Sequence, residues 1–199
     1  THVNLSANLD QVLANPDRPH GADEVALAVL PLFHVFGLNA VLGLTLRVGG
    51  TVVLVERFDP HSTLAAVAEH GVTVLSGVPT MWAAWAGLRD VEPGALASVR
   101  DAVSGAAPLD PAVRRAVRDR FGLDLTEGYG LTEASPVVTS GSATARPTAA
   151  SACRCPGSRC AWSTPKARTR WSATPARSGS AGPTCSPGTG TTPRPPRRR

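Results

Sequence analysis

Four short apolar runs, separated by segments of helical periodicity, constrain the fold of the first 140 residues more than any other feature. Uninterrupted apolar runs of this length are typical of strands that are covered on both faces, and the helical segments between them allow consecutive strands to run parallel. The pattern therefore predicts an α/β fold, with a partial mixed or parallel sheet and flanking helices. The expected strands are VALAVLPL (25–32), TVVLVE (51–56), VTVLSGV (72–78) and RDAVSGAA (100–107).

The ends of two expected helices are marked by residues with special backbone preferences. Asp59 and Asp110 each precede a proline, which suits an N-cap followed by the first helical turn. Gly71 and Gly122 follow the same helices, where glycine adopts a left-handed C-cap most easily. The expected helices span residues 4–14, 36–47, 59–69, 79–87 and 110–121, and residues 123–130 are expected to form one more strand that runs into a glycine-bounded loop.

Three chemically unusual loops follow expected strands: PLFHVFG (31–37), SGAAPL (104–109) and EGYGLTE (127–133). In an open α/β sheet, ligands bind at the ends of the strands, so these loops are candidates for one site. SGAAPL offers bare backbone to a flat ring, although a tight strand-to-helix turn uses the same residues. EGYGLTE presents a glycine-flanked tyrosine, a hydroxyl and a carboxylate, which suit a ligand with a phosphate and Mg²⁺, although a solvated loop could contain the same letters.

The histidine of the first loop has two interpretations. A neutral buried His34, satisfied by a backbone carbonyl, is more common than a working one. Its neighbours Phe33, Phe36 and Leu38 could line an apolar channel as readily as a core. The same ambiguity applies to residues whose helical spacing is typical of packing, namely Val78, Met81, Trp82 and Trp85.

Taken together and in order, the loops resemble one enzyme superfamily. PLFHVFGL, GVPTM, SGAAPL and EGYGLTEASP occur in the order and approximate spacing of the AMP-forming adenylating enzymes, which include acyl-CoA synthetases, luciferases and peptide-synthetase adenylation domains. The resemblance covers residues 1 to about 140 and implies a part of the family's large N-terminal domain. It also implies that the family's phosphate loop lies before Thr1 and is not among these residues.

The resemblance implies a site for an acyl-adenylate, with ATP or AMP, Mg²⁺ and coenzyme A as the small molecules of the reaction. Gly105, Ala106 and Ala107 are similar to the backbone shelf beside the adenine, and Tyr129 is similar to the ring that stacks on its other face. The cofactor-binding residues implied in this way are Gly105, Ala106, Ala107, Tyr129, Gly130 and Thr132.

The resemblance also implies the residues that meet the phosphate and the acid. Gly130 and Thr132 resemble contacts near the α-phosphate, and Glu133 resembles the Mg²⁺ ligand. His34 resembles the histidine at the carboxylate end of the acyl tunnel, so Thr132, Glu133 and His34 are the expected catalytic residues. The expected substrate-binding residues are His34, Phe33, Val78 and Met81.

The expected substrate is a carboxylic acid with an uncharged acyl tail. In the family, members that activate amino acids carry an aspartate near the PLFHVFGL region, but residues 31–48 of this chain contain no acid. A fatty-acid-activating ligase, part of fatty acid metabolism, is therefore the favoured subclass. A polypeptide of these residues alone is expected to be inactive, because the resemblance implies that a ribose-binding aspartate, a hinge and a catalytic lysine lie elsewhere. A pseudoenzyme that still binds nucleotide is the alternative.

The composition changes between residues 138 and 150. Residues 1–140 hold all fifteen acidic and nine basic residues, a formal charge of −6, whereas residues 141–199 carry +11 and nine of the eighteen prolines. The net charge of +5 therefore describes neither part, and it does not by itself indicate a nucleic-acid partner. No signal peptide opens the sequence and no apolar run is long enough to cross a bilayer, so a cytoplasmic location is expected.

The second segment, 141–199, has three interpretations. Because it contains no Leu, Val, Ile or Phe with which to form a core, it is expected to be a disordered basic tail, which could bind RNA or acidic surfaces. All four cysteines lie in it, but the C-x-C-x₄-C spacing matches no usual zinc site. The favoured interpretation is a change of reading frame between about residues 140 and 150. In that case the first two bases of each present codon are the last two bases of a codon in the original frame. Under this rule PARSGSAGPTCSPGTGTT (175–192) permits the sequence PGEIWVRGPNVFPGYWDD, which resembles what the family carries at this distance after its GYGLTE loop.

The nucleotide sequence tests the change of frame. From codons 138–150 onward, the reading frame displaced by one base is expected to continue the adenylating family, since the permitted letters already resemble it in two separated blocks. Sequencing the gene checks this, and codons 1–137 read in the displaced frame are the control that should show no such resemblance. Stop codons soon after the crossing would contradict the hypothesis.

Overall fold

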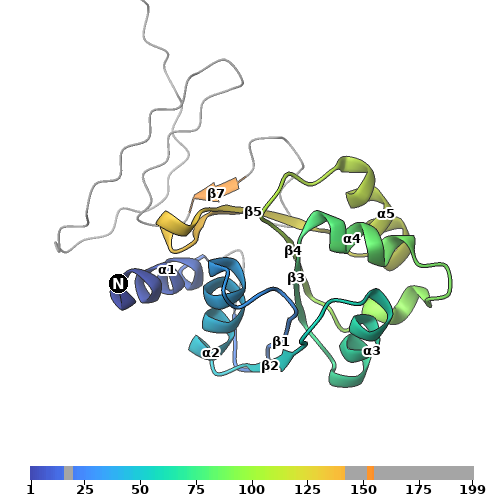
Figure 1. The fold of residues 1–199 in the computed structure, drawn as a ribbon, viewed down its shortest axis with the longest axis horizontal. Coiled ribbons are helices and arrows are strands. Elements are labelled where there is room, and N and C mark those ends of the chain that lie inside the picture. Colours follow the sequence, from blue (N-terminus) through green and yellow to red (C-terminus); the bar gives the residue numbers. More distant parts are fainter. Residues whose placement is uncertain (16–19, 142–151, 155–199) are drawn as a thin grey trace, which may run out of the picture. The chain divides into compact units, whose positions relative to one another are not determined.

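The computed structural model describes residues 1–15, 20–141 and 152–154. Seven strands form one sheet in the order β2-β1-β3-β4-β5-β6-β7 (Figure 1). The parallel strands are β1 (Val25–Ala28), β2 (Thr51–Leu54), β3 (Val74–Gly77), β4 (Asp101–Ser104) and β5 (Thr126–Gly130). They are followed by the antiparallel strands β6 (Val137–Gly141) and β7 (Ala152–Arg154). The predicted α/β fold with a largely parallel sheet is confirmed.

Helices cover both faces of this sheet (Figure 1). One face carries α3 (Pro60–His70), α4 (Pro79–Gly87) and α5 (Pro111–Phe121), and the other carries α1 (His2–Leu13), a π-helix (Phe36–Gly43) and α2 (Leu44–Arg47). Two short 3₁₀ helices span Pro93–Leu96 and Thr132–Ala134. No helix in the described part of the chain is both long and apolar enough to span a membrane.

The predicted helix caps are confirmed. The Asp59 carboxylate accepts a hydrogen bond from the Ser62 amide, which lowers the pKa of Asp59 from its ordinary value, and the Asp110 side chain accepts from the Ala112 amide. Gly71 and Gly122 end their helices with φ of 60° and 68°, in the left-handed region. Local sequence signals therefore decide where α3 and α5 begin and end.

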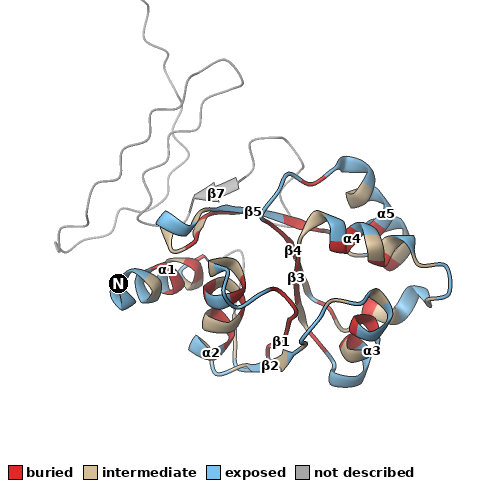
Figure 2. Ribbon diagram, viewed as in Figure 1, coloured by how far each residue is buried: buried red, intermediate tan, exposed pale blue. Residues whose placement is uncertain are grey.

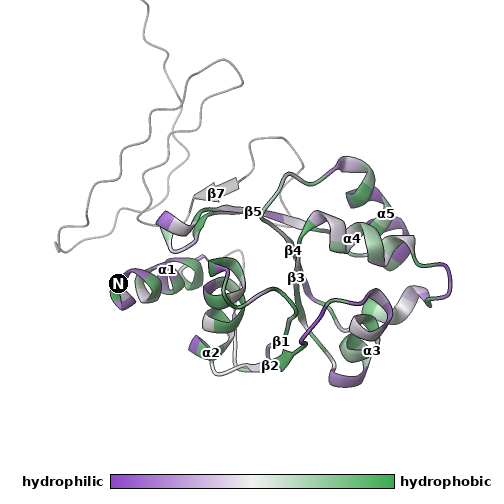
Figure 3. Cartoon of the chain, in the orientation of Figure 1, coloured by the Kyte–Doolittle hydropathy of each residue, from purple (hydrophilic) through white to green (hydrophobic). Residues whose placement is uncertain are grey.

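The densest core lies on the face covered by α3, α4 and α5. Trp82 and Trp85 are fully buried there, and their rings meet edge to face at 5.0 Å between centroids. Both indole N–H groups are satisfied, because Trp82 Nε1 donates to the Val103 carbonyl at 3.2 Å and Trp85 Nε1 donates to Thr63 Oγ1 at 2.9 Å. Figure 2 shows buried residues along the strands and the inner sides of these helices, and Figure 3 shows apolar residues concentrated at the same places.

Two predicted features differ from the structure. The expected helix 36–47 begins as a π-helix, and only its last residues are α-helical. The expected strand 123–130 is observed as β5, so the first part of the expected loop 127–133, including Tyr129, belongs to this strand, where Tyr129 pairs with Thr139. This pairing arises because the chain turns back after the 3₁₀ helix and forms the antiparallel strand β6, which the sequence did not indicate. The interpretations of the tail, as disordered, as a zinc site or as the product of a changed reading frame, concern residues outside the described part of the chain, apart from the backbone of 152–154. The domain boundary at residue 140 stays a prediction.

Replacing Thr63 by valine should expose how much the buried indole depends on its partner. Thr63 is fully buried, accepts from Trp85 and donates to the Asp59 carbonyl at 2.5 Å. Thr63→Val keeps the shape but leaves the indole N–H unpaired, so the free energy of unfolding should fall by about 1–3 kcal/mol. Thr51→Val on the exposed edge of β2 should change it by less than about 0.5 kcal/mol. Urea unfolding measures both, and equal effects would contradict the role given to Thr63.

Candidate functional site

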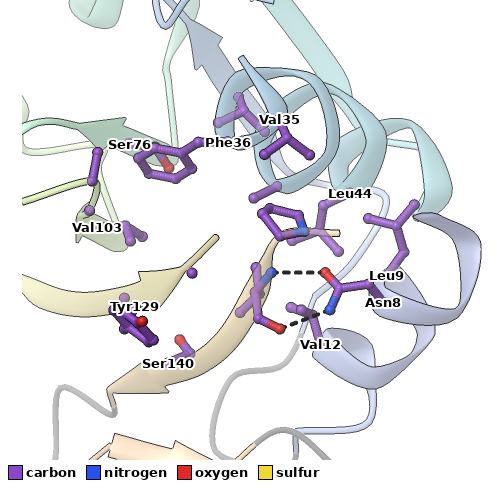
Figure 4. A pocket seen from close by; sticks show the side chains of 18 of the residues that line it. Asn8, Leu9, Val12, Val35, Phe36, Leu44, Ser76, Val103, Tyr129 and Ser140 are labelled. Atoms are coloured by element: carbon purple, nitrogen blue, oxygen red, sulfur yellow. Dashed lines mark hydrogen bonds between the residues drawn. The ribbon is translucent and has the colours of Figure 1, made fainter. Parts of the chain in front are cut away.

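A cavity of about 320 Å³ lies between the sheet and the helices α1 and α2 with their intervening π-helix (Figure 4). Its floor consists of residues that alternate along neighbouring strands and therefore point to one face, as Val74 and Ser76 do on β3. Leu9 and Val12 of α1 and Leu44 of α2 contribute apolar walls. The cavity thus occupies the sheet face opposite the two buried tryptophans.

The turn after β4 brings three distant segments together at one end of the cavity. Gly105 is buried, and a Cβ on it would lie 2.9 Å from the Phe36 ring and 3.6 Å from the Gly128 carbonyl oxygen. Only a residue without a side chain therefore fits between the π-helix and β5 without displacing the ring. Ala106 follows in the left-handed region, with φ of 69°, and also lines the cavity. The turn presents backbone groups to the cavity, as a shelf for a flat ring requires.

The strand β5 carries Tyr129 to the same end of the cavity. Its side chain is 53% exposed, so its ring is accessible to a ligand. The next residue, Gly130, is tightly held: a Cβ there would lie 2.5 Å from the Pro136 carbonyl oxygen. The Leu131 amide donates to that same oxygen at 3.0 Å. This closed loop holds the exposed Thr132 and Glu133 at the rim of the cavity.

His34 lines the cavity from the loop between β1 and the π-helix. Its Nδ1 accepts a hydrogen bond from the Phe36 amide at 3.2 Å. Because Nδ1 accepts, a neutral ring carries its proton on Nε2, which is then a donor. An exposed donor of this kind can bind a carboxylate or a carbonyl oxygen. The histidine is therefore exposed at the cavity and not a buried core residue.

Two buried side-chain amides connect the helices of this face to the segment after Glu133. Asn8 Nδ2 donates to the Val137 carbonyl at 2.8 Å, and Asn8 Oδ1 accepts from the Val137 amide at 3.1 Å (dashed in Figure 4). Asn39 Nδ2 donates to the carbonyls of Leu5 and Ser135, at 3.2 and 2.8 Å. These bonds fix α1 and the π-helix relative to the loop that carries Thr132 and Glu133.

The structure brings together most, but not all, of the predicted site residues. Those that line the cavity are His34, Gly105, Ala106, Tyr129, Gly130, Thr132 and Glu133. Four others lie away from it: Phe33 is 94% exposed, Ala107 is exposed, Val78 packs against the core, and Met81 is buried in that core. The roles predicted for these four in binding stay predictions, and a packing role is the one that their surroundings support for Val78 and Met81.

Several cavity residues were missed from the sequence. Asn8, Leu9 and Val12 share one face of an amphipathic helix, which indicates packing and does not reveal the cavity beside it. Glu24 also lines the cavity, although it lies outside residues 31–48, the segment in which the resemblance places an acidic residue. It precedes β1, and parallel pairing brings the start of that strand beside the start of β3. Only the tertiary arrangement places this acid at the cavity.

The residues at the rim could hold Mg²⁺ only together with the phosphates of a bound substrate. The described residues contain no group of three or more His, Cys, Asp or Glu that could hold a metal ion. Mg²⁺, however, is commonly bound through one or two carboxylates together with substrate phosphates and water. The exposed carboxylate of Glu133, beside the Thr132 hydroxyl, suits that arrangement. A bound ion would neutralise charge on phosphate oxygens.

The sequence matches a known family and several curated enzymes. The model of the family described as AMP-binding enzyme matches residues 1–168. The chain is 43% identical over 154 residues to 4-coumarate–CoA ligase 2 of Oryza sativa subsp. japonica, which covers 75% of this chain and 27% of that protein. It is 36% identical over 138 residues to the long-chain-fatty-acid–CoA ligase of Bacillus subtilis, covering 69% and 24%. The chain spans about a quarter of the length of these relatives.

Solved structures show the same similarity. The benzoate CoA ligase from Burkholderia xenovorans LB400 has a TM-score of 0.70 and 26% identity, over 79% of this chain and 32% of that one. ATP-bound MatB from Rhodopseudomonas palustris has a TM-score of 0.66 and 28% identity, over 73% and 28%. The fold observed here is therefore similar to a part of larger enzymes.

Removing the Asn8 amide should loosen the rim of the cavity. Asn8→Ala leaves the buried amide and carbonyl of Val137 without their partner, so the free energy of unfolding should fall by about 1–3 kcal/mol. Hydrogen exchange at the amides of residues 131–137 should accelerate, because the loop loses its attachment to α1. Asn4→Ala, on the exposed side of the same helix, is the matched control and should change neither quantity appreciably. Unchanged exchange in Asn8→Ala would refute the proposed attachment.

Proposed function

Since the chain belongs to the AMP-binding enzyme family, we propose that it forms the acyl-binding and adenine-binding part of an AMP-forming acyl-CoA ligase. One observation carries the proposal: three loops that are far apart in sequence line a single cavity through His34, Gly105 and Tyr129. The reaction of such a ligase needs an acid, a nucleotide and coenzyme A as small-molecule partners. The names of the curated relatives support this class of reaction.

The roles that we assign to the residues are those that the resemblance implies, and the positions of the residues around the cavity are compatible with them. The backbone at Gly105 and Ala106 faces one side of the adenine, and the accessible Tyr129 ring stacks on the other. Thr132 and Glu133 contact the α-phosphate and hold Mg²⁺ at the rim. His34 donates from Nε2 to the carboxylate of the acid, at the point where the acyl wall begins.

The chemistry requires positioning and charge neutralisation and no nucleophilic side chain. A carboxylate oxygen of the acid attacks the α-phosphorus of ATP, the bond to the bridging oxygen breaks, and pyrophosphate leaves. The thiol of coenzyme A then attacks the acyl carbonyl, loses its proton, and AMP leaves. The His34 donor holds the carboxylate in place for the first step and so reduces the freedom of the two reactants.

The acid carries an uncharged tail, a class that includes fatty acids. The side chains that face the tail are predominantly apolar, including Val12, Phe36, Val41, Leu44 and Val103. Glu24, the acid beside them, pairs through Oε1 with His20 Nδ1 at 2.7 Å, so a substrate amine would have to share this carboxylate with the histidine. A carbon chain or an aromatic ring fits this surface better than a charged group.

Nucleotide binding to the 199-residue polypeptide tests the proposal. Titration calorimetry with AMP, and with a non-hydrolysable acyl-adenylate carrying an uncharged tail, should detect binding. Tyr129→Ala should weaken the binding of both about tenfold, since stacking on an aromatic ring contributes about 1–3 kcal/mol per base. Tyr129→Phe keeps the ring and should bind like the unaltered chain.

The same samples separate binding from turnover. The polypeptide alone is expected to release no pyrophosphate from ATP above background with a panel of fatty acids, because the resemblance assigns further groups to other parts of the family's enzymes. Release above background would refute that expectation. Undetectable binding, or equal binding by Tyr129→Ala, would refute the nucleotide site. Salt-sensitive RNA binding by residues 141–199 would instead favour a nucleic-acid-binding tail.

A further inference from the structure

A polar pair lies at the inner end of the apolar cavity. His20 and Glu24 both line it, and their side chains are only 2% and 7% exposed. Both precede β1, and the cavity also includes Ala26 and Val74, which face each other at the amino ends of β1 and β3. Gly105 and Tyr129, by contrast, lie at the carboxyl ends of the strands. The cavity therefore follows the strands from the nucleotide end to this pair.

One atom of this pair, His20 Nε2, has no hydrogen-bond partner among the described residues. His20 Nδ1 and Glu24 Oε1 are 2.7 Å apart. An ionised carboxylate only accepts hydrogen bonds, so Nδ1 carries the proton and Nε2 of a neutral ring is left as an acceptor. Nε2 is buried, and among the residues that the structure describes none is within hydrogen-bonding reach of it. A buried acceptor of this kind is unfavourable unless a donor reaches it.

We propose that His20 Nε2 accepts a hydrogen bond from a hydroxyl group at the end of the acyl tail remote from the carboxylate, so that this chain prefers acids with a hydroxyl-terminated tail. The inference rests on the proposed function, because it assigns the inner end of the same cavity. A hydroxyl donates its proton to Nε2 and satisfies the leftover position. The apolar walls of α1 and α2 hold the carbon skeleton between this end and His34.

Charged tails suit this position less well. A second carboxylate would lie beside the Glu24 carboxylate, and like charges at short distance in an enclosed space repel strongly. An ammonium group offers donors, but its burial would require it to share the Glu24 carboxylate with His20, whose Nδ1 already binds Oε1. A methyl-terminated tail fits the walls but leaves Nε2 unpaired. A hydroxyl is neutral, small and a donor, and it alone meets all three conditions.

Matched pairs of acids test the proposal on the 199-residue chain. Titration calorimetry compares para-hydroxycinnamate with cinnamate and omega-hydroxydecanoate with decanoate, so that a phenolic hydroxyl and an aliphatic hydroxyl are distinguished. At least one hydroxylated acid should bind about tenfold more tightly than its parent, as expected for one hydrogen bond to a buried group. His20→Leu should abolish that preference while still binding the parent acid. His61→Leu is the control, because His61 is 56% exposed and pairs with Asp90 away from the cavity.

Each outcome has a separate meaning. On the unaltered chain, the affinity for each hydroxylated acid could lie within twofold of that for its parent acid. This result would overturn the role of His20 and leave the proposed function intact. The comparison does not depend on a variant that folds. A preference that persists in folded His20→Leu would also overturn it. Tighter binding of a dicarboxylic acid than of both hydroxylated acids would assign the pair to an anion instead. Failure of every acid to bind would contradict the proposed function itself.

Discussion

The two faces of the sheet are packed in different ways, and the site depends on this difference. On one face, α3, α4 and α5 press directly onto the strands, with two fully buried tryptophans filling the space between them. On the other face, buried asparagine amides hold α1 and the π-helix at the far side of the sheet. Such hydrogen bonds fix the position of a helix without filling the space beneath it. The closely packed face supplies rigidity, and the other face keeps a cavity.

The same amides connect the cavity to the loops where the reaction would take place. Asn39 lies on the π-helix, shortly after His34 in the sequence, and its side chain donates a hydrogen bond to the carbonyl of Ser135, just beyond Glu133. The residue expected to hold the acid and the residue expected to hold Mg²⁺ are therefore linked through one buried side chain. A π-helix widens the spacing of residues along this segment, and such segments are frequent at functional sites. Rigidity at this point matters, because transfer between two bound reactants depends on their alignment.

The sequence predicted the features that depend on local patterns. Apolar runs predicted the parallel strands, and Asp59 and Gly71 predicted the ends of α3, because caps act within a few residues. The antiparallel return of β6 was missed, since it depends on pairing with β5 and not on its own composition. The helical spacing of Met81 indicated packing, and Met81 is buried in the core, whereas its substrate-binding role was implied only by the resemblance and stays a prediction. The cavity role of Asn8 depends on its contact with Val137, far along the chain, and no local pattern contains that information.

The distribution of polarity in the cavity suggests where selectivity arises. Apolar walls discriminate weakly between acids, because one methylene group in such a pocket changes binding by only about 1–3 kcal/mol. A buried polar atom discriminates more strongly, since a ligand without a matching group leaves it desolvated and unpaired. On the proposed function, apolar walls of this kind would fit either an aliphatic chain or an aromatic ring, and the curated relatives are named for acids of both kinds. Under the proposal made for His20, selectivity would depend less on the volume of the cavity than on its unpaired Nε2, which distinguishes tails with a hydroxyl from tails without one, whether they are aliphatic or aromatic.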